Sequence, residues 1–229
     1  MKLTSVIIPV YNEENTVQEI LDKVNHIRKN INLEIIVVND GSTDRTPEIL
    51  NSNKHLIDNL INNEQNSGKG YAIKKGLVCA KGEYIFFQDA DNEYEPSNLI
   101  KFIEIMEKYN CDFLMGSRFI SENRSVIHFW HMLGNKFITF VFNLLNDTTF
   151  TDIYCCHCLF KRDLLNAQKL KSKGWGQQAE ILSHIVKKSK KNYETSVNYY
   201  ARSYSEGKKI RYFHVFEVLY WIFFTKFFS

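Results

Sequence analysis

The chain has 229 residues, of which 44% are hydrophobic and 24% are charged, so a disordered chain is excluded and one full hydrophobic core is expected. A net charge of +3 is too small to indicate a nucleic-acid partner, and we expect none. The charge is uneven, because residues 187–229 carry nine Lys and Arg against three Asp and Glu. This basic C-terminal region indicates either an anionic partner or a solvated, lysine-rich surface.

The five cysteines favour a reducing compartment over a disulfide framework, because their number is odd and no secretory signal precedes them. Cys155, Cys156 and Cys158 surround His157, but the second ligand pair of a typical zinc site does not follow. No window reaches the roughly 18 uncharged apolar residues that a transmembrane helix needs. The sequence enters a strand at Leu3, so no targeting segment is expected, and we predict a cytoplasmic protein.

Strands and helices alternate over the first half of the chain. Apolar runs predict strands at residues 3–10, 33–38, 56–61 and 112–115. The intervening segments predict helices at residues 12–30, 44–50, 71–80 and 96–109, the first of them capped by Asn12 or Asn15. Gly41 lies in a polar turn where a positive φ is expected. This alternation predicts an α/β fold with a mostly parallel central sheet and helices on both faces.

A further strand begins at Tyr84 and ends in two carboxylates, Asp89 and Asp91. Its apolar residues are typical of a strand covered on both faces. The two carboxylates are two residues apart, so they project to the same side in an extended chain, and the small Ala90 leaves room for a ligand. Such a pair repels itself unless a cation is present, and Mg²⁺ typically takes one or two carboxylates together with phosphate oxygens. The alternative is a pair of solvated turn aspartates.

In a parallel sheet, ligands bind outside the carboxyl ends of the strands. We therefore expect a single rim to collect the residues at these ends, which are Pro9, Tyr11, Glu13, Asp40, Asp89, Asp91 and Arg118.

The second half has a different character. Two aromatic, amphipathic helices are predicted at residues 126–145 and 212–228, and each is a candidate for core packing, a dimer contact or a position at a membrane surface. Between them, strands are predicted at 149–160 and 195–200, a helix at 177–186 and a basic loop at 202–211.

Several motifs occur together in the order typical of one family. They are Val6–Glu13, Val37–Asp44, Asn66–Gly70, Gln88–Asp91, Gly116–Arg118, Thr151–Asp152, Gln178–Glu180 and Ala201–Ile210. The sequence resembles glycosyltransferase family 2, with its Rossmann-like GT-A fold, and within that family the branch of polyprenyl-phosphate (dolichyl-phosphate) mannosyl- and glucosyltransferases. The resemblance implies one domain over residues 1–229. Residues 1–118 would form its nucleotide-sugar-binding half and residues 119–229 its acceptor-binding half.

The resemblance also implies roles for single residues. Four residues would hold the nucleotide base and ribose, namely Pro9, Tyr11, Glu13 and Asp40. Lys69 and Gly70 would lie near the nucleotide. Asp89 and Asp91, flanking Ala90, would bind Mg²⁺ or Mn²⁺ on the diphosphate, with Glu93 as a third ligand. The metal would take the charge that develops on the leaving nucleoside diphosphate.

On the acceptor side, Arg118 would grip the phosphate of a lipid acceptor, because a guanidinium binds phosphate oxygens bidentately. Arg202 and Lys208 would close over the donor diphosphate or the acceptor. Asp152 and Glu180 are the remaining carboxylates at family motif positions. One of them would be the general base if the acceptor were a hydroxyl.

The sequence thus predicts a metal-dependent inverting glycosyltransferase that moves a hexose from a UDP- or GDP-sugar to a polyprenyl phosphate at the cytoplasmic face of a membrane. Tyr154 and Cys158 replace a glutamate and a basic residue that many relatives carry, so the sugar and the acceptor stay open. One alternative is a transferase acting on a hydroxyl of a polysaccharide, a lipid-linked oligosaccharide or a protein. Another is a non-catalytic subunit that binds a nucleotide sugar. A homo-oligomer is also left open.

Overall fold

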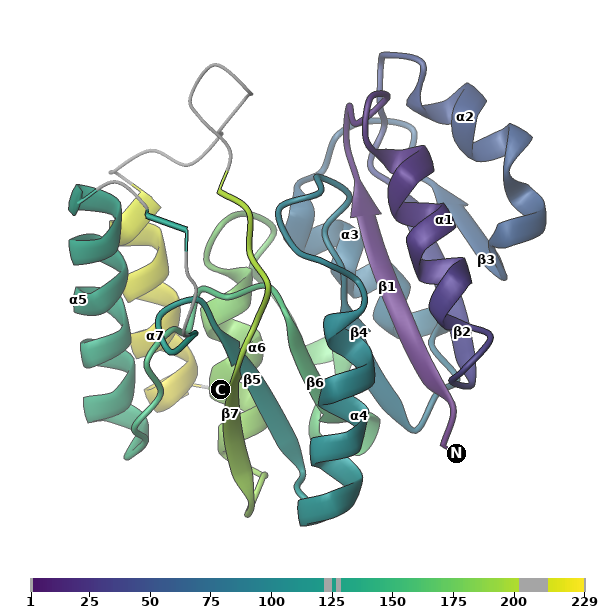
Figure 1. Ribbon diagram of the computed structural model, residues 1–229. Helices are drawn as coiled ribbons and strands as arrows, with labels where there is room; N and C mark the ends of the chain where they lie inside the picture. The colour runs from purple at the N-terminus through teal and green to yellow at the C-terminus, as the bar shows by residue number, and fades with distance from the viewer. Residues whose placement is uncertain (1, 122–124, 127–128, 202–213, 229) are drawn as a thin grey trace.

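The computed structural model describes residues 2–121, 125–126, 129–201 and 214–228. Within these ranges the strands are β1 (Thr4–Val10), β2 (Leu33–Asn39), β3 (Asn59–Asn62), β4 (Tyr84–Phe87), β5 (Phe113–Ser117), β6 (Cys158–Lys161) and β7 (Asn192–Ser196). They form one sheet in the order β3-β2-β1-β4-β6-β5-β7 (Figure 1). Only β6 runs antiparallel to its neighbours β4 and β5, so the prediction of a mostly parallel sheet is confirmed.

Helices cover both faces of this sheet. They are α1 (Val17–Ile27), α2 (Thr46–Ser52), α3 (Lys69–Cys79), α4 (Asn98–Tyr109), α5 (Phe129–Asn146), α6 (Gln177–Val186) and α7 (His214–Phe228), with 3-10 turns η1 (Lys54–Leu56), η2 (Arg162–Leu164) and η3 (Ala167–Lys169). Figure 1 shows α1 and α4 in front of the sheet and α3 behind it, while α5 and α7 lie side by side at the end of the molecule farthest from β3. α7 also packs on α6.

The core is built on the central strands. β2 and β4 are buried along their whole length because helices cover both of their faces. α1 buries one stripe against the sheet, made of Val17, Ile20, Leu21, Val24 and Ile27, at the three- and four-residue spacing of an amphipathic helix. The α/β arrangement brings the carboxyl ends of β1, β2, β4 and β5 to the same edge of the sheet.

Two predicted elements in the first half begin at the wrong residue. The first helix begins at Val17 rather than at residue 12, because Asn12 adopts a left-handed conformation with φ of 52° and bonds to the Thr43 backbone instead of capping a helix. The third strand spans only Asn59–Asn62, and the segment before it forms η1. Gly41 has the expected positive φ of 68°.

The strand predicted at residues 149–160 is also wrong, because it shortens to Cys158–Lys161. In this segment, side-chain carboxylates accept hydrogen bonds from backbone N–H groups that would otherwise pair with a neighbouring strand. Glu194 accepts hydrogen bonds from the backbone N–H groups of Thr151 and Asp152, and the carboxylate of Asp152 accepts one from Tyr154. Residues 147–157 therefore form a loop that turns over the end of β5. The strand predicted at 195–200 has the wrong bounds, because β7 spans Asn192–Ser196, although it lies on the sheet edge as expected.

Both aromatic helices are present, as α5 and α7. In the part of the chain that the structure describes, no helix combines the length and apolarity required to cross a bilayer. The basic loop predicted at 202–211 lies outside the described residues.

Candidate active site

A cavity of about 1340 Å³ lies at the edge where the parallel strands end. Its polar wall comes from the strand exits and from α3, and includes Asp40, Asn66, Lys69, Asp89, Asp91, Glu93 and Arg118. Its apolar wall comes from α5 and α7, and includes Leu133, Phe137, Ile138, Val215 and Val218. One hollow therefore joins a charged rim to the inner faces of the two aromatic helices.

The exits of β1 and β2 form one corner of this cavity. Pro9, Tyr11 and Glu13 line it at the end of β1, as predicted. Asp40 also lines it but is only 3% exposed, because its carboxylate accepts hydrogen bonds from the backbone N–H groups of Ser67 and Gly68 and from the side chain of Asn63. Asp40 thus fixes the loop before α3 while facing the predicted base and ribose position.

At the exit of β4, Asp89, Ala90, Asp91 and Glu93 all line the cavity. The buried side chain of Gln88 shapes this turn by donating to the carbonyl oxygens of Asp89 at 3.0 Å and of Tyr94 at 3.1 Å. No cluster of three or more His, Cys, Asp and Glu side chains able to hold a metal occurs among the described residues. A metal at Asp89 and Asp91 would therefore take its other ligands from a substrate or solvent.

Lys69, the first residue of α3, is paired with Asp89 at 2.5 Å between Nζ and Oδ1. Burial opposes the charge on this amine, yet the Asp89 and Asp91 carboxylates raise the pKa of Lys69 above its ordinary value. Gly70 does not line the cavity. Its role is packing, because a Cβ there would lie 2.6 Å from the carbonyl oxygen of Ser172.

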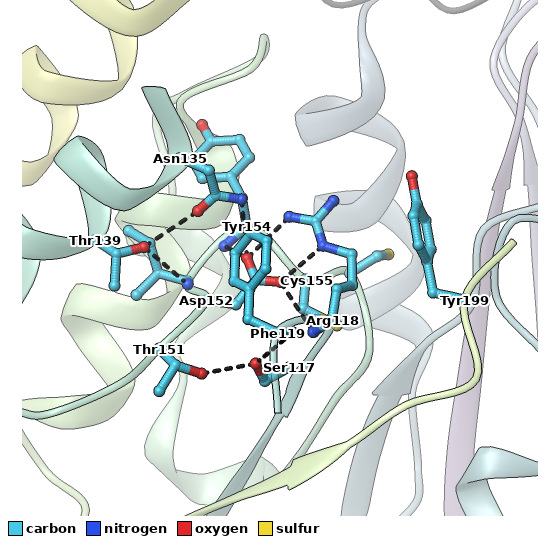
Figure 2. Close-up of polar contacts among 12 residues, drawn as sticks. Ser117, Arg118, Phe119, Asn135, Thr139, Thr151, Asp152, Tyr154, Cys155 and Tyr199 are labelled. Carbon is cyan, nitrogen blue, oxygen red and sulfur yellow. Dashed lines mark hydrogen bonds and ion pairs between the residues drawn. The ribbon is translucent and has the colours of Figure 1, made fainter. Parts of the chain in front are cut away.

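The exit of β5 carries a second ion pair. The Nε and Nη2 atoms of Arg118 bond to the two oxygens of Asp152 at 2.7 and 2.8 Å, and Asn135 from α5 donates to the same carboxylate at 2.9 Å (Figure 2). Asp152 is fully buried, and although burial alone would raise the pKa of its carboxyl, Arg118 lowers it below the ordinary value. Arg118 lines the cavity and Asp152 does not, so the carboxylate holds the guanidinium in place from behind.

Of the other predicted acceptor-side residues, the structure describes only Glu180, and it is not at the cavity. Glu180 is 2% exposed and does not line it, and its carboxylate accepts hydrogen bonds from the backbone N–H groups of Lys171 and Ser172, both at 2.9 Å. Burial raises the pKa of Glu180. Arg202 and Lys208 lie outside the described residues.

Tyr154 and Cys158, the two departures from the family pattern, differ in whether they line the cavity. Tyr154 lines the cavity and donates a hydrogen bond to the carbonyl oxygen of Trp175 at 2.7 Å, whereas Cys158 is buried in β6. The neighbouring His157 is buried, and its two ring nitrogens form hydrogen bonds with Gln88 at 3.0 Å and Asn98 at 3.3 Å. Burial lowers the pKa of His157 to about 3, so its ring is neutral.

Sequence reasoning assigned no role to four further residues that line the cavity, namely Asn135, Trp175, Gln178 and Tyr199. A signal existed for Asn135. It is a polar residue within an apolar, aromatic helix, and it lies four residues before Thr139, whose hydroxyl donates to it at 3.2 Å. Tyr199 comes from the segment after β7, and its ring lies 5.3 Å from the Arg118 guanidinium carbon.

The family model for glycosyl transferase family 2 matches residues 5–168, more than half of the chain. The chain belongs to glycosyltransferase family 2. This family 2 chain is 30% identical over 218 residues to an uncharacterized protein of Methanocaldococcus jannaschii, an alignment that covers 89% of the chain and 93% of that protein. The resemblance stated from the motifs is therefore confirmed, and the chain is a glycosyltransferase.

Other relatives of this family 2 chain have named activities. A dolichyl-phosphate beta-glucosyltransferase of Trichomonas vaginalis is 33% identical over 54% of the chain and 42% of that protein. A dolichol-phosphate mannosyltransferase of Pyrococcus furiosus is 34% identical over 51% of the chain and 33% of that protein. The chain thus matches less than half of the length of either named transferase.

Among solved structures, a crystal structure of glucosyl-3-phosphoglycerate synthase from Mycobacterium tuberculosis, in complex with Mn²⁺, UDP and phosphoglyceric acid, superposes with a TM-score of 0.70. The sequences are 16% identical, and the match covers 98% of this chain and 77% of that one. This likeness shows the shared fold, which is the GT-A fold that the motifs implied.

Proposed function

We propose that this family 2 enzyme is an inverting transferase that moves a hexose from a nucleotide sugar to the phosphate of a polyprenyl phosphate. The observation that carries the proposal is the cavity itself, which is charged at the strand exits and apolar along α5 and α7. An acceptor with an anionic head and an isoprenoid tail matches both walls. The named relatives that act on dolichyl phosphate support this choice.

The donor belongs at the exits of β1, β2 and β4. Pro9, Tyr11, Glu13 and Asp40 would hold the base and ribose, and a carboxylate such as Asp40 suits hydrogen bonding to a ribose hydroxyl. The hard oxygen donors of Asp89 and Asp91, which face one cavity from one strand exit, fit Mg²⁺ or Mn²⁺. When bound, the metal would neutralise charge on the leaving diphosphate. The Mn²⁺ and UDP in the structurally similar synthase support this placement.

The acceptor phosphate belongs at Arg118. An anionic phosphate is already a nucleophile, so it needs positioning and charge neutralisation rather than a general base. This agrees with the geometry, because Asp152 and Glu180, the two carboxylates predicted as bases for a hydroxyl acceptor, do not line the cavity. Asp152 instead holds Nε and Nη2 of the guanidinium. Arg118 would then meet the phosphate with the rest of its guanidinium.

A membrane surface would supply such an acceptor. The outer faces of α5 and α7 carry Phe140, Leu144, Phe216 and Phe227, which are between 62% and 75% exposed. The same helices form the apolar wall of the cavity, so their seating at an interface would place the cavity mouth next to lipid. The basic residues of 187–229 would favour an anionic, cytoplasmic leaflet.

The test is transfer of radiolabelled hexose. The chain is incubated with UDP- or GDP-hexose, Mn²⁺ and polyprenyl phosphate in vesicles, with unphosphorylated polyprenol as the matched control. We expect labelled lipid in the organic phase only with the phosphorylated acceptor. Release of nucleoside diphosphate without labelled lipid would contradict the proposed acceptor. Labelling of polyprenol itself would instead indicate a hydroxyl acceptor.

A further inference from the structure

The ion pair between Lys69 and Asp89 occupies a carboxylate that a metal would need. Its atoms are 2.5 Å apart, and both side chains line the cavity. The pair is accessible from the cavity, since 36% of the Lys69 side chain and 16% of the Asp89 side chain are exposed. The same Nζ lies 3.7 Å from the sulfur of Cys156, a further lining residue.

The backbone on both sides fixes this contact. The N–H of Gly68 donates to Asp40 at 2.8 Å, and the N–H of Gly70 donates to the carbonyl oxygen of Lys173 at 3.0 Å. Gly68 has φ of 96°, and a Cβ on it would lie 2.3 Å from that same carbonyl oxygen. Lys69 is thus directed towards the exit of β4 by a clamped helix start, while Gln88 holds the carbonyl of Asp89 from the other side.

Two cations cannot share Asp89 without repelling each other. A divalent ion ligated by this carboxylate would lie within a few ångströms of an ammonium group that is fixed at its backbone. A nucleoside diphosphate changes the balance, because its oxygens offer the ammonium a new anionic partner and offer the metal additional ligands. The flexible stem of a lysine allows its amine to move between such partners without backbone movement.

We propose that Lys69 holds Asp89 in the nucleotide-free protein, so that a divalent cation gains this carboxylate only after a diphosphate has drawn the amine away. Metal loading would then follow nucleotide binding. This inference rests on the proposed metal site at Asp89 and Asp91 and adds an order to its assembly. It makes Lys69 a positioning residue whose effect is visible in metal affinity before any turnover.

The test measures Mn²⁺ binding to the full chain by electron paramagnetic resonance, first without nucleotide and then with UDP or GDP. Without nucleotide, we expect weak binding to the natural protein and at least tenfold tighter binding to Lys69→Met. The matched control is Lys75→Met, which removes the same charge from an exposed position of the same helix and should leave affinity unchanged. Circular dichroism melting curves establish that each variant is folded.

A double-mutant cycle with Asp89→Asn separates release of the carboxylate from a general change of charge. The gain from Lys69→Met should disappear when Asp89 is Asn. Unchanged affinity of Lys69→Met, an equal gain in the Asp89→Asn background, or an equal gain from Lys75→Met would each overturn the inference. The Mn²⁺ binding experiment contains no acceptor, so its result stands even if the transfer assay contradicts the proposed polyprenyl phosphate acceptor. Absence of Mn²⁺ binding with nucleotide in every variant would refute the metal site itself, and the inference with it.

Discussion

Two ion pairs stand at the rim of the sheet, and they differ in burial and in the number of partners they hold. At the exit of β5, Asp152 is fully buried and accepts bonds from Arg118, Asn135 and the backbone of Tyr154. At the exit of β4, Asp89 pairs with a lysine whose side chain is 36% exposed. The same kind of contact is part of the framework in one place and open to exchange in the other.

The difference follows from what each site must do. Burying a carboxylate costs free energy unless both of its oxygens accept hydrogen bonds, so the Asp152 pair is held in one geometry. A guanidinium fixed in this way suits the recognition of a single phosphate. The proposed metal site at Asp89 would instead have to be filled and emptied, which a lysine side chain that is 36% exposed permits. Under the proposed function, the comparison assigns rigidity to the acceptor side and exchange to the donor side.

The largest expected effect concerns stability. Asp152→Ala leaves the Arg118 guanidinium buried without its partner, so we expect the free energy of unfolding to fall by about 3–5 kcal/mol. Asp89→Ala removes a more exposed pair and should cost no more than about 1 kcal/mol. Urea unfolding followed by circular dichroism measures both. Equal losses in the two variants would remove the distinction between the two ion pairs.

The second prediction concerns the exit of β4, where we expect a large effect on catalysis and a small effect on stability. Asp91→Ala should lower kcat by at least about 100-fold, because the charge on the leaving diphosphate loses its stabilisation. Its free energy of unfolding should stay near that of the natural protein, since Asp91 faces the cavity. The transfer assay with labelled nucleotide sugar measures kcat. Full activity in this variant would exclude a role for the β4 exit in metal-assisted departure.

Sequence reasoning located the strand exits that line one part of the cavity well. The exits of β1, β2 and β4 follow directly from local apolar runs that end in polar residues, and Asp40, Asp89 and Asp91 lie where those runs predicted. Local pattern suffices there because each strand is covered on both faces and its loop begins where the apolar run stops.

It located the surroundings of Arg118 and Asp152 poorly because they depend on partners that are distant in the sequence. The bond between Arg118 and Asp152 joins residues 34 apart, and the loop around Thr151 is held by Glu194, 43 residues away. The antiparallel strand β6 pairs with both β4 and β5, and the hydrophobic periodicity of a single segment does not predict this pairing. Glu180 belongs to a family motif, yet its carboxylate accepts hydrogen bonds from the backbone N–H groups of residues 171–172, a contact that the motif itself does not predict.

The third prediction concerns His157, which connects the two ion pairs. Its ring bonds Gln88 before Asp89, and its carbonyl oxygen accepts a hydrogen bond from Gly116 before Arg118. Burial lowers the pKa of His157 to about 3, whereas the unfolded chain titrates near 6.5. Below about pH 6.5 the unfolded state gains a proton that the folded state lacks, so stability falls as the pH falls towards 3.

Urea unfolding at pH 6, 5 and 4 measures this effect. In His157→Gln, the free energy of unfolding should depend less steeply on pH, by about 1.4 kcal/mol per pH unit. His184, whose pKa burial lowers to about 4, is present in both proteins, so its contribution cancels in the difference. An identical slope in the two proteins would show that the ring of His157 does not stay neutral in the fold.

The smallest expected effect tests how α5 reaches the acceptor side. Asn135 donates a hydrogen bond to the oxygen of Asp152 that also binds Nη2 of Arg118 (Figure 2). The side-chain oxygen of Asn135 accepts a hydrogen bond from the hydroxyl of Thr139. Asn135→Leu removes one of several bonds to a buried carboxylate and should loosen the guanidinium without releasing it. We expect the acceptor KM to rise about tenfold, in line with about 1.5 kcal/mol for a hydrogen bond to a charged group. The donor KM should not change.

Thr139→Val is the matched control, because it removes the bonds of the Thr139 hydroxyl to Asn135 and to the backbone N–H of Ile153 while leaving the bond from Asn135 to Asp152 intact. Initial rates at varied polyprenyl phosphate and varied nucleotide sugar separate the two KM values. A rise confined to the acceptor KM would show that a residue of the aromatic helix sets the position of Arg118. Equal changes in both KM values would mean that the two sides of the cavity are not independent, which contradicts the division between a rigid acceptor side and an exchangeable donor side.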